Sequence, residues 1–286
     1  MIDLIREMLL TESYFDREVI LDICKRARGV SNYAQVYELT YNQLPPKTAP
    51  IIEFMQENEL VGGKKIMEIM AGNGFETKHI RNNLPGNHYV CSDITDYSGP
   101  TDGITYQKID CTDKNYKVGN KQSDLYDLVF IGGANASMCM LTSLQEVIGL
   151  SKFLKNAIKN DGYAILSYFE EHFFQTNFTI DYSVSITHDF KDESKNGLYA
   201  HWFSGLKRDL ETQLHHYYDL VAVSPSPVLA KGIQYTEIFY NKEPFTARSW
   251  QTAIVMEIME NAGFKYVGSK WNVEPRFMPF QKVNAT

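Results

Sequence analysis

Short apolar runs alternate with helical or polar segments through the middle of the chain. Five runs of strand length occupy residues 65–70, 89–93, 104–109, 127–132 and 163–168. Each run is apolar over most of its length, and the intervening segments are one to three dozen residues long. Apolar strands joined by helices are typical of a parallel sheet covered on both faces. The pattern predicts a doubly wound α/β fold, with ligands at the carboxyl ends of the strands.

Helical patterns precede and follow this region. The first thirty residues place apolar side chains at helical spacing, and a further helix is predicted over 48–58, between Pro45-Pro46 and Gly62-Gly63. Near the end of the chain the pattern predicts a helix over 246–261 and two final strands over 264–272 and 276–283. These strands complete a mostly parallel, seven-stranded sheet.

The hydrophobic period changes to two after Tyr168. Alternating segments cover 178–190, 198–203, 212–223 and 232–240, which predicts an antiparallel layer. We therefore expect a helical N-terminal cap over 1–60 and a main domain formed by 61–175 and 242–286. Residues 176–241 are expected to form an inserted antiparallel lid over the substrate site.

Composition and charge narrow the function classes. The 286 residues carry a formal net charge of −7, which is unfavourable for a protein that grips nucleic acid phosphates. The four cysteines stand singly without CxxC spacing, so neither a zinc site nor a disulfide scaffold is expected. No apolar stretch reaches the length of a membrane span, and the N-terminus does not resemble a signal peptide. We expect a cytoplasmic protein with no membrane or nucleic acid partner and no metal.

A small-residue turn follows the first strand of the sheet. The strand carries Glu68 near its end, and Ala71-Gly72-Asn73-Gly74 then leads into a helix that begins near Phe75. Glycines allow positive φ and close approach of the backbone to a ligand, and the helix start offers free N–H groups. The dinucleotide spacing Gly-x-Gly-x-x-Gly is absent, because Thr77 stands at the third position. Any tight strand–helix turn can look similar, so the turn alone does not identify a site.

Two further acids follow the next two strands. Asp93 ends the second strand, where a carboxylate can accept both ribose hydroxyls. Asp110 follows the third strand, where it can accept an adenine amino proton. A single strand-end aspartate is usually a turn or helix cap. Three acids after three consecutive strands, beside a glycine turn, instead indicate a nucleoside site without a phosphate requirement.

This constellation resembles class I S-adenosylmethionine-dependent methyltransferases over residues from about 37 to 286. In the segment from Glu68 to Gly74, Met70 stands where the family's first glycine would be. The resemblance implies the Rossmann-like methyltransferase fold, S-adenosyl-L-methionine as cofactor and S-adenosyl-L-homocysteine as product. It implies that Asp93 holds the ribose and Asp110 the adenine amine. The implied cofactor-binding residues are Tyr41, Glu68, Ala71, Gly72, Gly74, Asp93, Ile94, Asp110, Cys111 and Gly132.

A narrower likeness is to aminosugar N,N-dimethyltransferases and glycine N-methyltransferase-like enzymes. The segment Tyr37-Glu-Leu-Thr-Tyr41 and the pair His201-Trp202 carry it, together with the inserted antiparallel layer. It implies that Tyr41 lies at the sulfonium end of the cofactor, although Tyr37 and Tyr41 also share one helix face. Met138 and Asn135 replace a histidine and a serine of the sugar enzymes, which puts the aminosugar substrate itself in question.

Fewer residues can be assigned to catalysis and to binding of the methyl acceptor. His201 is the candidate general base and Tyr41 the second candidate catalytic residue, while Asn135, Glu170 and Trp202 are candidate substrate contacts. A strand histidine is more often structural, so that alternative stays open. The predicted function is methyl transfer to an amine or hydroxyl of a small molecule, such as a sugar or natural-product intermediate. The alternatives are a protein methyltransferase and a non-catalytic cofactor-binding partner subunit, and the helical N-terminus is a candidate homodimer element.

Overall fold

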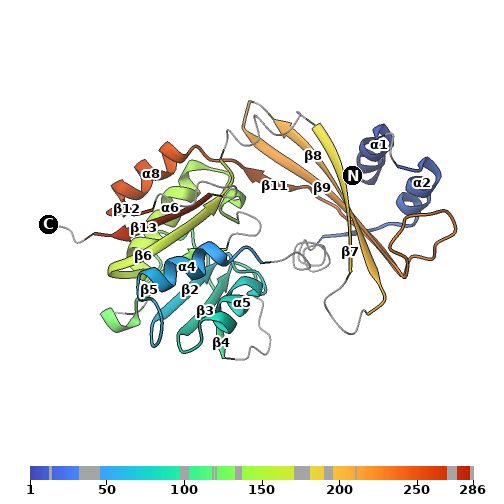
Figure 1. Ribbon diagram of the computed structural model, residues 1–286. Coiled ribbons are helices and arrows are strands. Elements are labelled where there is room, and N and C mark those ends of the chain that lie inside the picture. Colours follow the sequence, from blue (N-terminus) through green and yellow to red (C-terminus); the bar gives the residue numbers. More distant parts are fainter. Residues whose placement is uncertain are drawn as a thin grey trace. The chain divides into compact units, whose positions relative to one another are not determined.

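The structure is a computed structural model (Figure 1). It describes residues 1–12, 15–31, 46–96, 103–117, 119, 121–132, 137–170, 181–189, 196–209, 211–268 and 276–283. The chain divides into two compact units, each discontinuous in sequence. One unit combines Met1–Pro45 with Asn177–Arg248, and the other combines Pro46–Thr176 with Ser249–Thr286.

The unit that contains the glycine turn is built on a seven-stranded sheet. Its strand order is β12-β13-β6-β5-β2-β3-β4. Neighbours among β2 to β6 pair in parallel, whereas β13 runs antiparallel to both β6 and β12. The predicted doubly wound, mostly parallel sheet is therefore confirmed. The strands are β2 (Lys65–Ile69), β3 (His88–Asp93), β4 (Ile104–Lys108), β5 (Tyr126–Ile131), β6 (Ile158–Tyr168), β12 (Phe264–Tyr266) and β13 (Arg276–Lys282).

Helices with one apolar face pack beside this sheet. In α4, Ile51, Phe54 and Met55 are buried in one cluster with Leu128 and Phe130 of β5. The start of α6 is set by a capping box, in which the Ser143 hydroxyl accepts from the Glu146 N–H and the Glu146 carboxylate accepts from the Ser143 N–H. The helices of this unit are α4 (Ala49–Glu57), α5 (Phe75–Asn83), α6 (Leu144–Ala157) and α8 (Thr252–Asn261), with short 3₁₀ turns at Gln122–Asp124 and Ser137–Met140.

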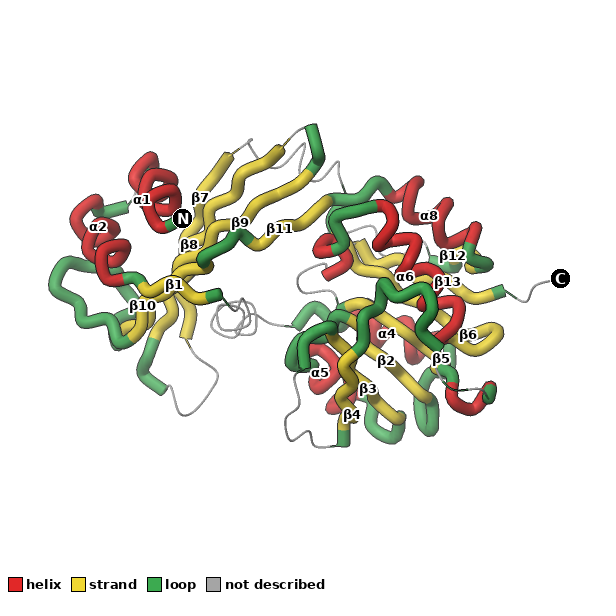
Figure 2. Tube along the Cα trace, turned by 180° about the vertical axis from the view of Figure 1, so that it is seen from behind, coloured by secondary structure: helices red, strands yellow, loops and turns green. Residues whose placement is uncertain are grey.

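The other unit contains a second sheet, whose strands are mostly antiparallel. Its order is β1-β10-β9-β8-β7, with β11 also pairing with β9 (Figure 2). All pairs are antiparallel except β1 with β10. The antiparallel layer predicted from the period of two is thus present. The strands are β1 (Arg28–Val30), β7 (Asp181–Asp189), β8 (Tyr199–Asp209), β9 (Leu214–Ser224), β10 (Glu237–Asn241) and β11 (Phe245–Arg248).

Two N-terminal helices cover one face of this second sheet. They are α1 (Ile2–Thr11) and α2 (Arg17–Arg26), and the Asp16 carboxylate caps α2 by accepting from the N–H groups of Glu18 and Val19. Their apolar side chains form one buried cluster with strands β8, β9 and β10. The hydrophobic face of the N-terminal segment is therefore used within this unit, as burial of an amphipathic stripe requires. The cluster includes Ile5, Leu9, Ile20, Ile23, Phe203, Leu220 and Ala222.

Some predicted boundaries are wrong. Residues 246–248 were expected to begin a helix, but Phe245–Arg248 is strand β11 and the helix begins at Thr252. Four residues are too few to distinguish the two periods, and pairing of Phe245 with Tyr217 and Thr246 with His216 decides the outcome. Strand β6 also begins at Ile158 instead of residue 163. Of the predicted strand 264–272, residues 264–266 are strand and residues 269–272 lie outside the described residues.

Among the described residues, none of the helices combines the length and apolar character that crossing a membrane requires.

Candidate functional site

The glycine turn after β2 is tied to the neighbouring strand β3. The Ala71 N–H donates to the Ser92 carbonyl at 3.0 Å, and the Gly72 N–H donates to Asp93 Oδ2 at 3.0 Å. Gly72 and Gly74 have φ of 52° and 70°, a region that residues with a Cβ rarely adopt. The turn therefore needs glycine at both positions, and it lies at the carboxyl edge of the parallel strands.

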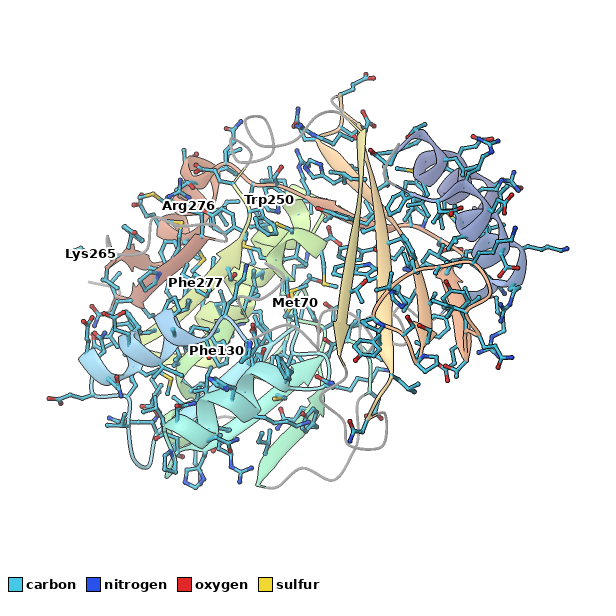
Figure 3. The ribbon with its side chains drawn as sticks, turned by 45° about the vertical axis from the view of Figure 1, so that its right-hand side comes forward. Met70, Phe130, Trp250, Lys265, Arg276 and Phe277 are labelled. Atoms are coloured by element: carbon cyan, nitrogen blue, oxygen red, sulfur yellow. The ribbon has the colours of Figure 1, made fainter. Side chains whose placement is uncertain are left out.

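Met70 is a non-glycine residue in the same left-handed region. Its φ is 56°, at the position where the family resemblance has its first glycine. Met70 directly follows β2, and Phe130 lies near the end of the adjacent β5; both are labelled in Figure 3. A side chain held in this region costs on the order of 1 kcal/mol. The hydrogen bonds of the following turn residues hold the backbone there against that cost.

Two buried glutamates meet at the end of β5. Glu68 of β2 is only 3% exposed, and its Oε2 accepts from the Thr77 N–H at 3.1 Å and from Thr77 Oγ1 at 2.5 Å. Glu76, in the first turn of α5, is also buried. A Cβ on Gly132 would overlap Glu76 Oε2 and lie 2.6 Å from Glu68 Oε1. Both carboxyl groups therefore press against the same backbone position, which only glycine can fill.

This arrangement perturbs the Glu68 carboxyl group. Burial raises its pKa well above the ordinary value, and the Glu76 and Asp93 carboxylates act in the same direction. The hydrogen bonds from Thr77 partly oppose the shift. Strongly shifted acids gather at functional sites more often than elsewhere. A buried carboxyl group with a raised pKa beside a glycine turn marks this edge of the sheet as the candidate site.

We expect Glu68→Gln to make the protein more resistant to urea as the pH rises. Because the pKa of the Glu68 carboxyl group is raised by folding, its contribution to the free energy of unfolding is fully present below about pH 4.5. This contribution is lost as the pH rises through the folded-state pKa. Glutamine keeps an acceptor for Thr77 but has no proton to lose. The variant should gain at least about 1 kcal/mol over wild type at pH 8, and the gap should close near pH 4.5. Glu260→Gln, on an exposed part of α8, is the control, and a pH-independent gap would contradict the prediction.

Asp93 and Asp110 both occupy Asx turns at the strand ends. Asp93 Oδ1 accepts from the Thr95 N–H at 2.9 Å, and Asp110 Oδ1 accepts from the Thr112 N–H at 2.9 Å. Burial raises the pKa of the Cys111 thiol to about 12, and the Asp110 and Asp93 carboxylates act in the same direction. Asp93 receives one N–H on each oxygen, which leaves further lone pairs for ligand hydroxyls.

The remaining predicted residues of this unit have different surroundings. Ile94 is 65% exposed next to Asp93, as a side chain open to a ligand would be. Glu170 forms an ion pair with Arg276 of β13. Burial acts to raise the Glu170 pKa, but hydrogen bonds from Thr252 and Arg276 outweigh it and the pKa is lowered. Its carboxylate is thus already engaged by the protein. Tyr41 and Asn135 lie outside the described residues.

His201 and Trp202 are successive residues of β8 and point to opposite faces of the second sheet. His201 is fully buried; its Nδ1 lies 3.0 Å from Thr187 Oγ1, and its Nε2 lies 3.0 Å from both Ser224 Oγ and the Ser226 carbonyl oxygen. Its neighbour across the ladder, Ala222, belongs to the cluster under α1 and α2. Both ring nitrogens therefore have partners within the sheet. This geometry favours a structural part for His201, and its role as a base stays a prediction.

Trp202 faces the other side, where its Nε1 donates to Asp219 Oδ1 at 2.9 Å. Asp219 is fully buried on β9 and is not among the residues predicted from sequence. The available signal was an aspartate inside the otherwise apolar end of a strand, directly before Leu220 and Val221. Because Trp202 and His201 lie on opposite faces, the two cannot contact one ligand from the same side of the sheet. The substrate role of Trp202 stays a prediction.

Within the described residues, no group of three or more His, Cys, Asp or Glu side chains is arranged to hold a metal ion.

Comparison with known proteins gives a result at the level of fold. No family model matches the chain, and no curated protein matches it in sequence. Several solved structures match over nearly their full length. DesVI from Streptomyces venezuelae has a TM-score of 0.64 at 14% identity, covering 90% of this chain and 100% of its own. CalS10, a SAM-bound amino pentose methyltransferase from Micromonospora echinaspora, has a TM-score of 0.63 at 13% identity, with coverages of 90% and 100%.

A third neighbour covers still more of this chain. The sugar N-methyltransferase KedS8 from Streptoalloteichus sp. matches with a TM-score of 0.62 at 12% identity, covering 96% of this chain and 97% of its own. These matches span both the seven-stranded sheet and the second sheet, since each covers most of the chain. The chain therefore has the fold of these solved methyltransferases, which confirms the resemblance at the level of fold.

Proposed function

We propose that this protein transfers a methyl group from S-adenosyl-L-methionine to a small-molecule acceptor. The observation that carries the proposal is the arrangement of Glu68, Asp93 and Asp110 at the ends of β2, β3 and β4, beside a turn held open by Gly72 and Gly74. The carboxyl edge of a doubly wound sheet is where ligands bind. A carboxylate with spare lone pairs can accept hydrogen bonds from ribose hydroxyls. The turn lacks the phosphate-binding glycine spacing, so it is compatible with a nucleoside that carries no phosphate.

Under this proposal each residue has a defined part. Asp93 accepts hydrogen bonds from the ribose, Asp110 from the adenine amine, and the exposed Ile94 side chain contacts the base. Ala71, Gly72 and Gly74 line the methionine end, Glu68 and Gly132 lie beneath it, and Cys111, which directly follows Asp110, lines the adenine end. Tyr41 remains a candidate for the sulfonium end. Asn135, Glu170 and Trp202 remain candidate acceptor contacts.

The protein's contribution to the reaction is positioning. The cofactor, when bound, supplies an activated methyl group on a sulfonium. The chain must then hold the acceptor in line with that methyl group and keep water out of the site. An acceptor nucleophile in line with the methyl–sulfur bond can react without a covalent intermediate on the protein.

We infer that the acceptor is an amine or hydroxyl on a sugar-like or natural-product molecule. Support comes from two fold neighbours, one an amino pentose methyltransferase and one a sugar N-methyltransferase by their descriptions. These two neighbours cover 90% and 96% of this chain, so the match is not confined to the seven-stranded sheet. The predicted lid function of residues 176–241 stays a prediction, as does the choice between N- and O-methylation.

The testing experiment is equilibrium binding of S-adenosyl-L-homocysteine by titration calorimetry. Binding in the micromolar range, equivalent to about 8 kcal/mol, is the expected result. ATP and NAD⁺ serve as controls, because both contain adenosine but require phosphate contacts. An acceptor screen with labelled cofactor would follow, beginning with amino sugars. Absence of S-adenosyl-L-homocysteine binding would overturn the proposal.

Binding without methyl transfer to any small molecule would favour one of the alternatives. A protein substrate would appear as methyl incorporation into a polypeptide fraction. A non-catalytic partner subunit would bind the cofactor and stimulate a second protein. The acceptor screen therefore separates all three outcomes once cofactor binding has been measured.

We expect His201→Asn to lower stability by about 1–3 kcal/mol, because the substitution leaves Thr187, Ser224 and Ser226 without their buried partner. The measurement is urea unfolding, with His79→Asn on the exposed side of α5 as control. Methyl transfer per folded molecule should stay unchanged. A large fall in turnover with unchanged stability would instead support the predicted role of His201 as base.

A further inference from the structure

Tyr106 lies under the glycine turn although it belongs to a different strand. In the sheet, Glu68 of β2 is in register with Cys91 of β3, and Cys91 is in register with Tyr106 of β4. The three side chains therefore form one row on one face. The Tyr106 hydroxyl donates a hydrogen bond to the backbone carbonyl of Asn73, in the turn. The edge strand β4 thus reaches the turn through a single side chain.

The peptide group between Asn73 and Gly74 is held at both ends. Its carbonyl oxygen accepts from Tyr106, and its N–H, on Gly74, donates to the Ala71 carbonyl at 2.9 Å. Gly74 has a φ of 70° and sits directly against Tyr106 and Cys91. A Cβ there would overlap the Tyr106 hydroxyl and lie 2.7 Å from Cys91 Sγ. Glycine is required both by the backbone angle and by this close approach.

A peptide that ends in glycine has more than one accessible orientation. Glycine populates positive and negative φ about equally, so the Asn73–Gly74 peptide, like the Ala71–Gly72 peptide, can rotate unless other contacts hold it. Rotation would exchange the positions of its carbonyl oxygen and its N–H. The methionine end of the cofactor carries an ammonium and a carboxylate, which need an acceptor and a donor in fixed places. In the observed orientation this peptide's carbonyl oxygen and N–H are bonded to Tyr106 and Ala71, so the peptide acts on that end of the ligand by setting the path of the turn and not by a direct hydrogen bond.

We propose that Tyr106 is a positioning residue that locks the Asn73–Gly74 peptide in the orientation that binds the amino-acid end of the cofactor. The inference rests on the proposed function, since it concerns the same site. Burial raises the Tyr106 pKa, and the nearby Cys91 and Glu68 groups add to the shift, so the hydroxyl remains a donor across the physiological range. Without the lock, part of the population would hold the turn in a form that binds the ligand less well.

The test compares two ligands on the Tyr106→Phe variant. S-adenosyl-L-homocysteine carries the amino-acid end, whereas 5′-methylthioadenosine has the same nucleoside and thioether without it. Loss of one hydrogen bond to the turn should weaken S-adenosyl-L-homocysteine binding about fivefold to tenfold. Binding of 5′-methylthioadenosine should change less than about twofold, because its contacts lie at the strand-end aspartates. The ratio of the two affinities does not depend on the folded fraction, so modest destabilisation does not obscure the result.

Tyr89→Phe is the matched control. The Tyr89 hydroxyl also donates to a backbone carbonyl, that of Leu84 at 2.6 Å, at the far end of α5. Removing it deletes an equivalent tyrosine bond without touching the turn, and neither ligand should bind differently. Equal weakening of both ligands in Tyr106→Phe, or no weakening, would overturn the positioning role and leave the proposed function intact. Failure of the wild type to bind S-adenosyl-L-homocysteine would overturn both.

Discussion

Asp93→Ala is expected to weaken binding of S-adenosyl-L-homocysteine by at least about a hundredfold. Two hydrogen bonds from ribose hydroxyls to a carboxylate contribute roughly 1.5–3 kcal/mol each, and a hundredfold change corresponds to about 2.7 kcal/mol. The substitution also removes the acceptor of the Gly72 N–H, which ties the glycine turn to β3. Both effects act on the same ligand, so we expect this change to be the largest among single substitutions in the site. Titration calorimetry measures it directly.

Two variants separate ribose recognition from support of the turn. Asp93→Asn retains one oxygen, which can accept either from the Gly72 N–H or from a ribose hydroxyl, and should give an intermediate loss. Asp113→Ala removes a different aspartate whose Oδ1 likewise accepts an N–H two residues on, from Asn115 at 2.9 Å. Because Asp113 is exposed in the loop after β4, its removal should leave the affinity unchanged. Equal effects of Asp93→Ala and Asp113→Ala would contradict the ribose role.

Gly132→Ala is expected to lower the free energy of unfolding by about 1–3 kcal/mol and to weaken cofactor binding. The added methyl group would overlap the Glu76 carboxylate and crowd that of Glu68, and both side chains are too buried to move into solvent. Chemical denaturation measures the stability, and calorimetry with S-adenosyl-L-homocysteine measures the affinity. An unchanged midpoint for unfolding would show that the carboxyl groups yield at little cost.

A second substitution tests the cause of this effect. Glu76→Ala removes the side chain that the new methyl group meets first, so the double variant Gly132→Ala/Glu76→Ala should recover part of the lost stability. The double-mutant cycle isolates the steric coupling between the two positions from the separate effect of each change. Additive losses would mean that the two residues do not interact. In that case the destabilisation would come from the backbone of Gly132 itself.

The residues of the candidate site whose positions could be predicted from sequence are those fixed by strand ends. In a parallel sheet, all carboxyl ends meet at one edge, so a residue's place after its strand also gives its place in space. Asp93 and Asp110 could be located in this way, and so could Gly72 and Gly74, whose positive φ or close approach only glycine allows. The five apolar runs likewise predicted parallel strands joined by helices, because strands covered on both faces are apolar along their length. The edge strand β4 is the exception, since Thr105, Gln107 and Lys108 are exposed.

Other features depended on contacts between segments distant in the sequence. Pairing with β9 made residues 245–248 a strand, since four residues carry too little periodicity to decide. Sheet register placed Tyr106 beneath Asn73, and the packing of α5 beside the sheet brought Glu76 and Glu68 against Gly132; no spacing rule connects these positions. The face of His201 followed from which side of its strand the N-terminal helices cover. Sequence alone thus determined the fold class and the edge of the sheet that carries the candidate site, because periodicity and glycine geometry are local properties. Only the tertiary structure decided which side chains support that edge, because burial and side-chain contacts arise when distant strands and helices pack together.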